Sequence, residues 1–489
     1  MSQDPSPPRT VTPSGPVRGT LENGVAVFRG IPYAQAPVGA LRLRAPEPVA
    51  PWDGVLVADR FGPTAPKVPY APPMDALLPD PEVPGDGCLN LNVWAPWEPG
   101  EGQAPGPGRP VMVWVHGGSL VRGSSAVPVY DGTAFARDGV VLVSLNYRLG
   151  IEGFGVFPDA PANLGLLDQI AALRWVRDCV AAFGGDPERV TVFGESAGAI
   201  SVAALLTAPA ARGLFRRAVV QSGAPIALPL ARARATTEAV ARRLGVPATV
   251  AALAGVDRDR LLAAQTEVTG KGTPLTGGHS FQPAVDGDLL PRDPAVALAE
   301  GASAEVEVLM GTNTEEYRLW FVPGGLTERV GRFTLRLALW KTRTPARILR
   351  AYRAGRPGAL PGELLGALAA DKLLLVPQTR LADARRAGPA RTFVYEFGWP
   401  SPVRGLGACH ALELGFVFDT LGRPGTDALT GPDAPQELAD AMHAAWVRFA
   451  ATGDPGWRAW DGSRPIMTFG PDAPALVEGV RADELSAWD

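Results

Sequence analysis

Cysteine is scarce in this sequence of 489 residues. The three cysteines, Cys88, Cys179 and Cys409, are too few for a disulfide framework and lack the spacing of metal ligands. Disulfides persist in oxidising compartments, whereas cytoplasmic thiols stay reduced. We therefore expect three reduced thiols and a cytoplasmic protein.

Long apolar runs are also missing. No run reaches the roughly 18 apolar residues that a bilayer-spanning helix needs. The first 15 residues, MSQDPSPPRTVTPSG, are polar and proline-rich and have no apolar core like that of a secretory signal. We expect neither a membrane anchor nor secretion by a conventional signal.

Neither sign of charge is in large excess, since 46 Lys and Arg face 50 Asp and Glu, for a formal net charge of -4. The chain thus lacks the basic signature of nucleic-acid binding. Its 46% hydrophobic content suffices for a large core. Because no internal repeat and no linker separates two self-sufficient halves, we expect one domain over residues 1–489, with a flexible tail over 1–14.

From residue 111 onward, short β-rich apolar runs alternate with longer helical patterns. This alternation is typical of parallel strands joined by crossover helices. We expect an α/β fold with a mostly parallel central sheet flanked by helices, and with helical insertions over 228–300 and 320–390 that could roof a pocket. The expected strands are 110–115, 140–145, 190–193, 218–221, 306–310 and 392–397, and the expected helices include 166–183, 199–206 and 435–452.

A candidate nucleophile lies in Gly194-Glu195-Ser196-Ala197-Gly198, which fits the pattern G-x-S-x-G. In the α/β-hydrolase fold this motif forms a sharp strand-to-helix turn, and its small residues let strand and helix approach closely. A glycine-rich turn with an incidental serine is the alternative. The expected strand 190–193 before it and the expected helix after it favour Ser196 as the nucleophile.

Serine needs a base to become nucleophilic, normally a histidine. In this fold the chain order is serine, acid, histidine. This order excludes His116, which precedes the motif, and disfavours His279, which precedes the acid assigned below. His443 lies on the amphipathic pattern of 435–452. The remaining candidate is His410, which follows the strand 392–397 in a glycine-rich turn.

A tetrahedral intermediate also needs preorganised donors for its oxyanion. The segment His116-Gly117-Gly118-Ser119 follows the strand 110–115, and its glycines allow backbone N–H groups to face a substrate oxygen. We expect Gly117, Gly118 and Ala197 to form the oxyanion hole.

With these motifs, the sequence resembles the type-B carboxylesterases, the family of bacterial para-nitrobenzyl esterases, animal carboxylesterases and cholinesterases. The resemblance extends from about residue 15 to residue 460 and is densest in the first half. Further blocks that carry it are Phe28-Arg29-Gly30-Ile31-Pro32-Tyr33-Ala34, Cys88-Leu89-Asn90-Leu91-Asn92-Val93, Asn146-Tyr147-Arg148-Leu149-Gly150, Asn163-Leu164-Gly165-Leu166-Leu167-Asp168-Gln169 and Phe183-Gly184-Gly185-Asp186-Pro187.

The resemblance implies the acid of the triad. The family block G-x-N-x-[DE]-E is matched by Gly311-Thr312-Asn313-Thr314-Glu315-Glu316, which selects Glu316 over the adjacent Glu315. The base block is matched by Cys409-His410-Ala411-Leu412-Glu413-Leu414. Glu195, Ser222 and Glu413 are expected to orient the acid and the base.

Four features of the sequence depart from the family pattern. The third glycine of the oxyanion loop is Ser119, and the glycine after the acid is Tyr317. Gly87 replaces the acidic residue of Glu-Asp-Cys, and no partner cysteine precedes Cys88. The first departure bears on the room for the alcohol group of a substrate, and the second on the backbone after the acid.

The resemblance and the motifs together predict a serine carboxylesterase that hydrolyses small-molecule esters through an acyl-enzyme on Ser196. No metal and no organic cofactor is implied, and neither nucleic acid nor membrane is an expected partner. The oligomeric state and the natural substrate cannot be read from the sequence. Hydrolysis of an amide or carbamate by the same triad is the alternative, because the motif does not distinguish the leaving group. A non-catalytic binding module on the same fold is disfavoured by the intact triad.

Overall fold

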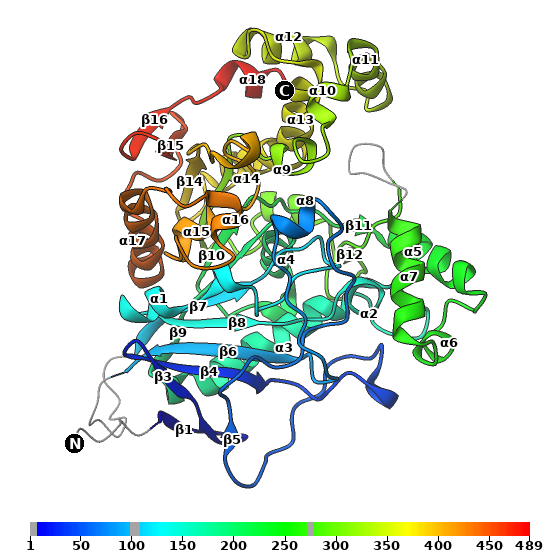
Figure 1. The fold of residues 1–489 in the computed structure, drawn as a ribbon, viewed down its shortest axis with the longest axis vertical. Coiled ribbons are helices and arrows are strands. Elements are labelled where there is room, and N and C mark those ends of the chain that lie inside the picture. Colours follow the sequence, from blue (N-terminus) through cyan, green and yellow to red (C-terminus); the bar gives the residue numbers. More distant parts are fainter. Residues whose placement is uncertain (1–6, 98–107, 271–277) are drawn as a thin grey trace.

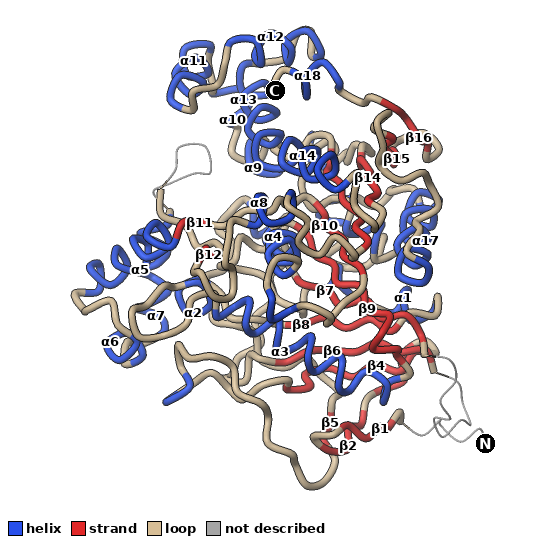
Figure 2. Tube along the Cα trace, turned by 180° about the vertical axis from the view of Figure 1, so that it is seen from behind, coloured by secondary structure: helices blue, strands red, loops and turns tan. Residues whose placement is uncertain are grey.

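The computed structural model describes residues 7–97, 108–270 and 278–489. Its centre is a twisted sheet that helices cover on both faces (Figure 1, Figure 2). The strand order is β16-β15-β14-β13-β10-β9-β7-β8-β6-β4-β3. These strands are β3 (Thr20–Glu22), β4 (Val25–Pro32), β6 (Asn90–Pro96), β7 (Arg109–Val115), β8 (Val141–Leu145), β9 (Gly185–Glu195), β10 (Arg217–Gln221), β13 (Glu307–Asn313), β14 (Thr392–Phe397), β15 (Pro465–Phe469) and β16 (Ala475–Glu478).

The middle of this sheet is parallel and its edges are antiparallel. Every pairing from β8 through β7, β9, β10, β13 and β14 to β15 is parallel. The pairings β3–β4, β4–β6, β6–β8 and β15–β16 are antiparallel. The prediction of a mostly parallel central sheet is therefore confirmed, and all six predicted strands are present.

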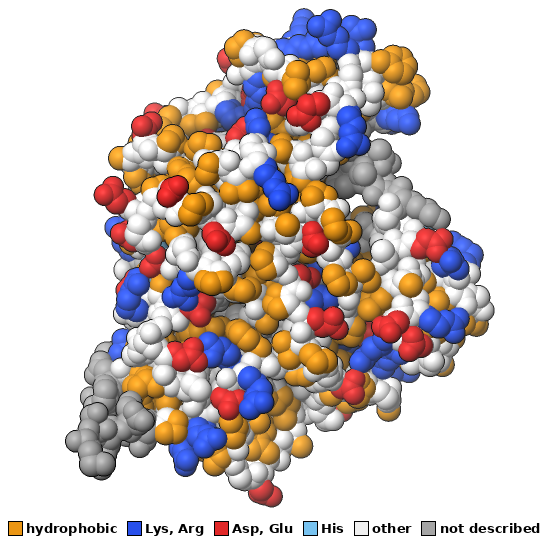
Figure 3. Space-filling view, viewed as in Figure 1, with side chains coloured by type: hydrophobic (Ala, Val, Ile, Leu, Met, Phe, Trp, Pro, Cys, Tyr) orange, Lys and Arg blue, Asp and Glu red, His pale blue; other side chains and the backbone are white. Residues whose placement is uncertain are grey.

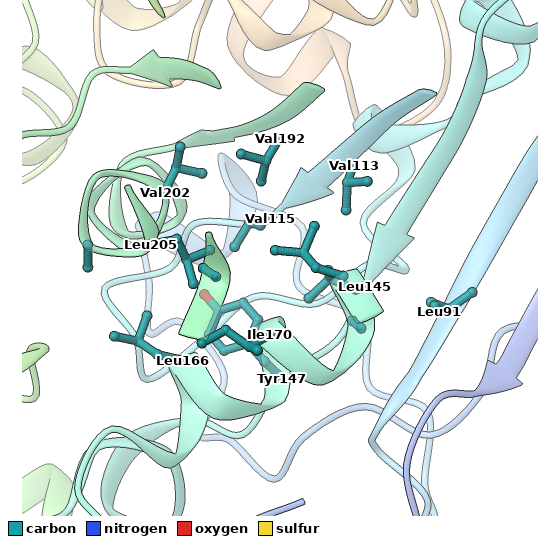
Figure 4. Packing of buried hydrophobic residues seen from close by; sticks show 14 of the residues in the cluster. Leu91, Val113, Val115, Leu145, Tyr147, Leu166, Ile170, Val192, Val202 and Leu205 are labelled. Carbon is teal, nitrogen blue, oxygen red and sulfur yellow. The ribbon is translucent and has the colours of Figure 1, made fainter. Parts of the chain in front are cut away.

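The central strands are buried on both faces because apolar residues occupy most positions in their middle. On β7, Val113 and Val115 pack in one cluster with α3 (Leu164–Cys179) and α4 (Ala197–Leu205), as Figure 4 shows. Met112 and Trp114 point to the opposite face and join a second cluster. That cluster includes Trp446 and Phe449 of α17 (Gln436–Thr452). Two apolar layers thus hold the sheet rigid beneath its connecting loops.

The two regions predicted as helical insertions are indeed helical. After β10 the chain forms α5 (Leu230–Leu244), α6 (Val250–Ala254), α7 (Arg258–Thr269) and α8 (Pro294–Ala299). After β13 it forms α9 (Arg318–Phe321), α10 (Leu326–Arg329), α11 (Arg332–Lys341), α12 (Ala346–Gly355), α13 (Pro361–Ala370) and α14 (Val376–Arg385). Helices α11 to α13 share an apolar cluster of their own, which includes Leu335, Tyr352 and Leu364, and they form a lobe at one end of the molecule (Figure 1).

The remaining elements are short. The additional strands are β1 (Arg9–Thr12), β2 (Gly15–Arg18), β5 (Leu56–Val57), β11 (Leu228–Pro229) and β12 (Ala284–Val285). The additional helices are α1 (Thr133–Arg137), α2 (Gly150–Phe154), α15 (Leu414–Val417), α16 (Asp427–Thr430) and α18 (Ala482–Ser486). No helix in the described ranges is long and apolar enough to cross a bilayer.

The N-terminal region differs from the flexible tail predicted over residues 1–14. Residues 1–6 lie outside the described residues, but Arg9–Thr12 form β1, which pairs antiparallel with β2. The physical reason is alternation: Thr10 and Thr12 are buried and their neighbours are exposed, which suits a half-buried β-hairpin. For residues 9–12 the tail prediction is wrong.

Candidate active site

Three strands bring the predicted triad to one edge of the sheet. Ser196 follows β9, Glu316 follows β13 and His410 follows β14. In the sheet, β9 and β13 flank β10, and β14 lies beyond β13. Because all four strands are parallel, the loops after them meet at the same edge. The fold therefore gathers residues that are far apart in the sequence.

Ser196 occupies a strained turn between β9 and α4. Its backbone has φ 55° and ψ -121°, and its N–H donates to the carbonyl of Gln221 at 2.9 Å. Glycines make this turn possible. A Cβ on Gly198 would lie 2.0 Å from the carbonyl oxygen of Val115, and one on Gly194 would lie 2.7 Å from the backbone of Gly198. Strand and helix could not approach this closely with larger residues.

His410 and Glu316 form a buried pair. The imidazole Nδ1 lies 2.5 Å from Oε2 of Glu316, and the side chains are 6% and 3% exposed. Oε1 of Glu316 accepts from the N–H of Asn313 at 2.8 Å. A carboxylate at Nδ1 holds the proton on that nitrogen and leaves the lone pair of the neutral ring on Nε2. This is the tautomer that a general base requires.

The adjacent Glu315 has different partners. Its Oε1 accepts from Nε of Arg318 at 2.5 Å, and its Oε2 accepts from the N–H of Ala408 at 3.1 Å. The neighbouring carboxylates thus diverge: Glu316 faces the imidazole, and Glu315 faces a guanidinium and the loop that leads to His410.

Glu195 lies on the other side of the imidazole. Its Oε1 is 2.9 Å from Nε2 of His410, although the two atoms are not aligned for a hydrogen bond. Within the described residues no hydrogen bond joins the Ser196 hydroxyl to His410, so the serine and the base lie in one pocket but are not yet bonded. Apo sites often leave this bond open until substrate arrives.

Burial and the two carboxylates act in opposite directions on His410. Burial alone lowers the pKa of the imidazole, but the charges of Glu195 and Glu316 outweigh it and raise the pKa of His410 well above its ordinary value. Burial also raises the pKa of Glu195. The candidate base therefore holds its proton more tightly than a free histidine.

Of the other residues predicted to orient the triad, Glu413 forms no direct hydrogen bond with Glu316 or His410 within the described residues. It accepts from Nδ2 of Asn313 at 2.7 Å and from Nε2 of Gln221 at 3.2 Å, and only Asn313 in turn contacts Glu316. Burial raises the pKa of Glu413 to about 8. The Ser222 hydroxyl is buried with no hydrogen-bond partner in the described part of the chain, so no hydrogen bond links it to the acid or the base.

Sequence reasoning missed Asn313 and Gln221 as members of this network. Trp446 Nε1 donates to Oε1 of Gln221 at 3.1 Å, which fixes the amide so that its NH2 group faces Glu413. Asn313 lies inside the block that identified the acid, and Gln221 directly precedes Ser222. Their positions were visible, but the pairing of two amides with one buried carboxylate depends on contacts between strands.

Two of the predicted oxyanion donors, Gly117 and Gly118, line the same pocket as Ser196, and the third, Ala197, follows Ser196 in the chain. A Cβ on Gly117 would lie 3.3 Å from Cβ of Ser196, and Gly118 has φ 108°, a conformation that suits glycine. In the described ranges the N–H groups of Gly117 and Gly118 donate no hydrogen bond. Ala197 begins α4, where backbone N–H groups have no partner within the helix. These donors are free to bind a substrate oxygen.

His116 supports the oxyanion loop from below. Its ring stacks on Tyr147, whose hydroxyl donates to the carbonyl of His116 at 2.8 Å. Burial lowers the pKa of His116 to about 4, so that this ring stays neutral. Ser119 and Leu120 continue the loop with φ 57° and 60°.

A largely apolar pocket opens above the serine. Its empty volume is about 910 Å³, part of it open to solvent. The ring of Trp320 lies 4.6 Å from that of His410 at its wall, and Asp80, which is paired with the buried Lys67, closes one side. Further lining residues are Tyr70, Leu77, Leu78, Val127, Val129, Tyr130, Leu319, Leu412, Leu414, Leu429 and Thr430.

Comparison with known proteins gives one consistent result. The model of the carboxylesterase family matches residues 6–465. The para-nitrobenzyl esterase of Bacillus subtilis is 39% identical over 469 residues, which cover 92% of this chain and 90% of that protein. The phenmedipham hydrolase of Pseudarthrobacter oxydans is 37% identical over 97% of this chain and 96% of its own. A crystal structure of the Geobacillus stearothermophilus carboxylesterase EST55 superimposes with a TM-score of 0.87 at 36% identity and covers 98% of this chain and 100% of its own.

Proposed function

This chain belongs to the carboxylesterase family and has the α/β-hydrolase fold, and from this premise we propose that its ester hydrolysis proceeds through Ser196, His410 and Glu316. The protein is a carboxylic ester hydrolase that acts on small-molecule esters. The assignment of each catalytic role to a residue is the proposal.

In the proposed first half-reaction, Nε2 of His410 removes the hydroxyl proton of Ser196 as the serine oxygen attacks the ester carbonyl. The N–H groups of Gly117, Gly118 and Ala197 bind the oxyanion of the tetrahedral intermediate. Collapse of this intermediate breaks the bond to the alcohol oxygen, which takes the proton from the imidazolium. The acid portion of the ester remains on the serine.

In the second half-reaction, water replaces the alcohol. His410 removes a proton from the water, the hydroxide oxygen attacks the acyl carbonyl, and the carboxylic acid leaves as Ser196 regains its proton. Glu316 stabilises the imidazolium that forms in both halves. The observation that carries the proposal is the buried 2.5 Å contact between His410 and Glu316, beside a serine whose backbone is held at φ 55°.

A covalent inhibitor tests the nucleophile. A sulfonyl fluoride should label Ser196, and ester hydrolysis should fall in proportion to the label. Ser196→Ala should lower kcat by about 10³-fold or more, and the oxyanion hole should leave some residual activity. Ser201→Ala is a matched control, because Ser201 is a buried serine on α4, the helix that directly follows Ser196. A label found elsewhere, together with full activity of Ser196→Ala, excludes the assignment.

Amide or carbamate hydrolysis by the same residues is the second candidate. The three substrate classes pass through similar oxyanions and differ mainly in the leaving group. The observation in its favour is that one relative, at 37% identity, is named for phenmedipham hydrolysis. Turnover of a p-nitrophenyl ester, a p-nitrophenyl carbamate and a p-nitroanilide that share one acyl chain separates the candidates.

We further propose that the protein works in a reducing compartment such as the cytoplasm. The support is that Cys88, Cys179 and Cys409 are all free and buried. Burial raises the pKa of Cys88 and Cys179 to about 12, which keeps these thiols neutral and unreactive at physiological pH. Fractionation of the source cells, followed by an activity stain, tests the location.

A further inference from the structure

Helix α11 has two apolar faces, and only one of them is packed. Leu335 and Leu339 are buried in the cluster of the α11–α13 lobe. On the other face, Phe333 is 79% exposed, Leu337 39% and Trp340 76%. Their spacing of four and three residues aligns these side chains in one stripe along the helix. This outer stripe, Phe333, Leu337 and Trp340, has no cover within the described chain.

Exposed aromatic side chains are few in the described chain. Phe333 and Trp340 belong to the stripe, and the third, Trp320, lines the active-site pocket instead. Leu326 and Leu360 add to the same lobe. In Figure 3 orange side chains lie beside blue ones on this upper lobe, with some red ones among them. Single exposed apolar residues are normal on a protein surface, whereas several that lie together mark an interaction site.

The chain segment that carries the stripe has charges of one sign. Residues 329–362 contain no Asp or Glu, although the whole chain has a net charge of -4. In the described structure, Arg332, Arg336 and Lys341 form no ion pair. At 100° per residue, Arg336 and Lys341 flank the stripe on its two sides. The basic residues of this segment are Arg329, Arg332, Arg336, Lys341, Arg343, Arg347, Arg350, Arg353 and Arg356.

We propose that the outer face of α11 binds the surface of an anionic lipid membrane. Helices that lie in a membrane interface combine Trp, Phe and Leu on one face with Lys and Arg at its borders, where the cations reach lipid phosphates. Helix α11 has this arrangement. The lobe also protrudes at one end of the molecule (Figure 1, Figure 2), so a flat surface can approach the lobe without first meeting the sheet.

A second copy of this chain fits the face less well. A symmetric dimer through α11 would bring Arg336 and Lys341 of one copy against the same cations of the other, and like charges at an interface oppose binding. An anionic surface neutralises these cations instead. Peripheral binding of this kind needs no membrane-spanning helix, and it would place the enzyme at lipid surfaces without embedding it.

Co-sedimentation with vesicles tests this proposal. The full chain should bind vesicles of equimolar phosphatidylglycerol and phosphatidylcholine in 50 mM NaCl, and at least tenfold more weakly when the vesicles are pure phosphatidylcholine or the salt is 0.5 M. Two double variants should each weaken binding at least tenfold: Phe333→Ser with Trp340→Ser, and Arg336→Glu with Lys341→Glu. Neither should change hydrolysis of a soluble short-chain ester by more than about twofold, since the face is distinct from the pocket.

Matched controls use exposed residues of another surface. Leu476→Ser, on β16, removes an apolar side chain that is 40% exposed, and Arg212→Glu with Arg216→Glu makes the same charge change at two exposed arginines outside the α11–α13 lobe. These controls should bind vesicles like the native protein. Vesicle binding that survives both α11 variants overturns the proposal. So does a concentration-dependent dimer in sedimentation equilibrium that Trp340→Ser abolishes while vesicles do not bind, because that result assigns the face to self-association.

Discussion

Nδ1 of His410 lies 2.5 Å from Oε2 of Glu316, whereas the adjacent Glu315 pairs with Arg318. We therefore expect Glu316→Gln to lower kcat by about 10²–10⁴-fold, because an amide at this position does not hold the imidazole in the required tautomer. Steady-state kinetics on a soluble ester, with circular dichroism to confirm folding, measures the effect.

Glu315→Gln is the matched control for that experiment. An amide oxygen can still accept from the N–H of Ala408, and the partly exposed pair with Arg318 contributes little. The change in kcat should be less than about tenfold. If Glu315→Gln instead shows the large loss of kcat, the acid is shifted by one position and the assignment of Glu316 fails.

The pH profile should reveal the charge of Glu195. The base must be neutral to accept a proton, so kcat/KM rises with pH through the ionisation of His410. Because Glu195 and Glu316 raise this pKa, the rising limb should lie above the ordinary range of a histidine. Glu195→Gln removes one of the two charges, lowers the pKa of His410 and should move the limb to lower pH.

Glu315→Gln also controls the pH experiment, since its carboxylate faces Arg318 and should leave the limb in place. A limb that stays fixed or moves to higher pH in Glu195→Gln contradicts the electrostatic role of Glu195. The profile should not change on addition of a chelator, because no step of the proposed mechanism uses a metal.

The strand-to-helix turn at Ser196, called the nucleophile elbow, should tolerate no side chain at Gly198. A Cβ there would lie 2.0 Å from the carbonyl oxygen of Val115, which is backbone in the centre of the sheet and cannot move aside. Gly198→Ala should lower the free energy of unfolding by about 3 kcal/mol or more, or prevent folding. Urea denaturation followed by fluorescence checks this.

Gly331→Ala is the comparison for Gly198. It has φ -85°, and no atom would lie within 4 Å of its Cβ. Its free energy of unfolding should change by less than about 1 kcal/mol. If both glycine variants were equally stable, close packing at the elbow would not be the reason for its glycines.

Ser119 should lose strain when it becomes glycine. Its φ of 57° is costly for a residue with a Cβ, and glycine adopts it freely. Ser119→Gly should therefore raise the free energy of unfolding by up to about 1 kcal/mol, part of the gain being offset by the extra freedom of glycine in the unfolded chain. Ser119→Ala keeps the strain and should show no gain. Thermal unfolding of the two variants distinguishes backbone strain from an effect of the hydroxyl.

The sequence was sufficient for features that depend on local pattern. The strand before Ser196 and the helix after it could be predicted because apolar runs and glycine spacing are properties of neighbouring residues. The carboxylate partner of His410 was given by resemblance alone, since Glu315 and Glu316 are chemically equal in the sequence. Their divergence is decided by Arg318 and by the loop around Ala408.

Contacts between distant segments were out of reach of the sequence. Glu195 was expected to help orient the triad, but its approach to Nε2 of His410 depends on where the loop after β14 meets the end of β9. The strand β1 was mistaken for part of a tail because its pattern spans only four residues. The sequence predicted only helical structure over 320–390 and did not single out α11, since periodicity does not tell which of two apolar faces is buried.

The order of the three triad residues along the chain has a consequence for its synthesis. The acid and the base stand 94 residues apart, and ribosomes add roughly 5–20 residues per second. The histidine therefore emerges roughly 5–20 s after the glutamate, and both emerge after the serine. A nascent chain carries its elbow and its oxyanion loop for all of that time without a base. Esterase activity thus reports synthesis beyond His410, and a translation product that ends before this residue should be hydrolytically silent.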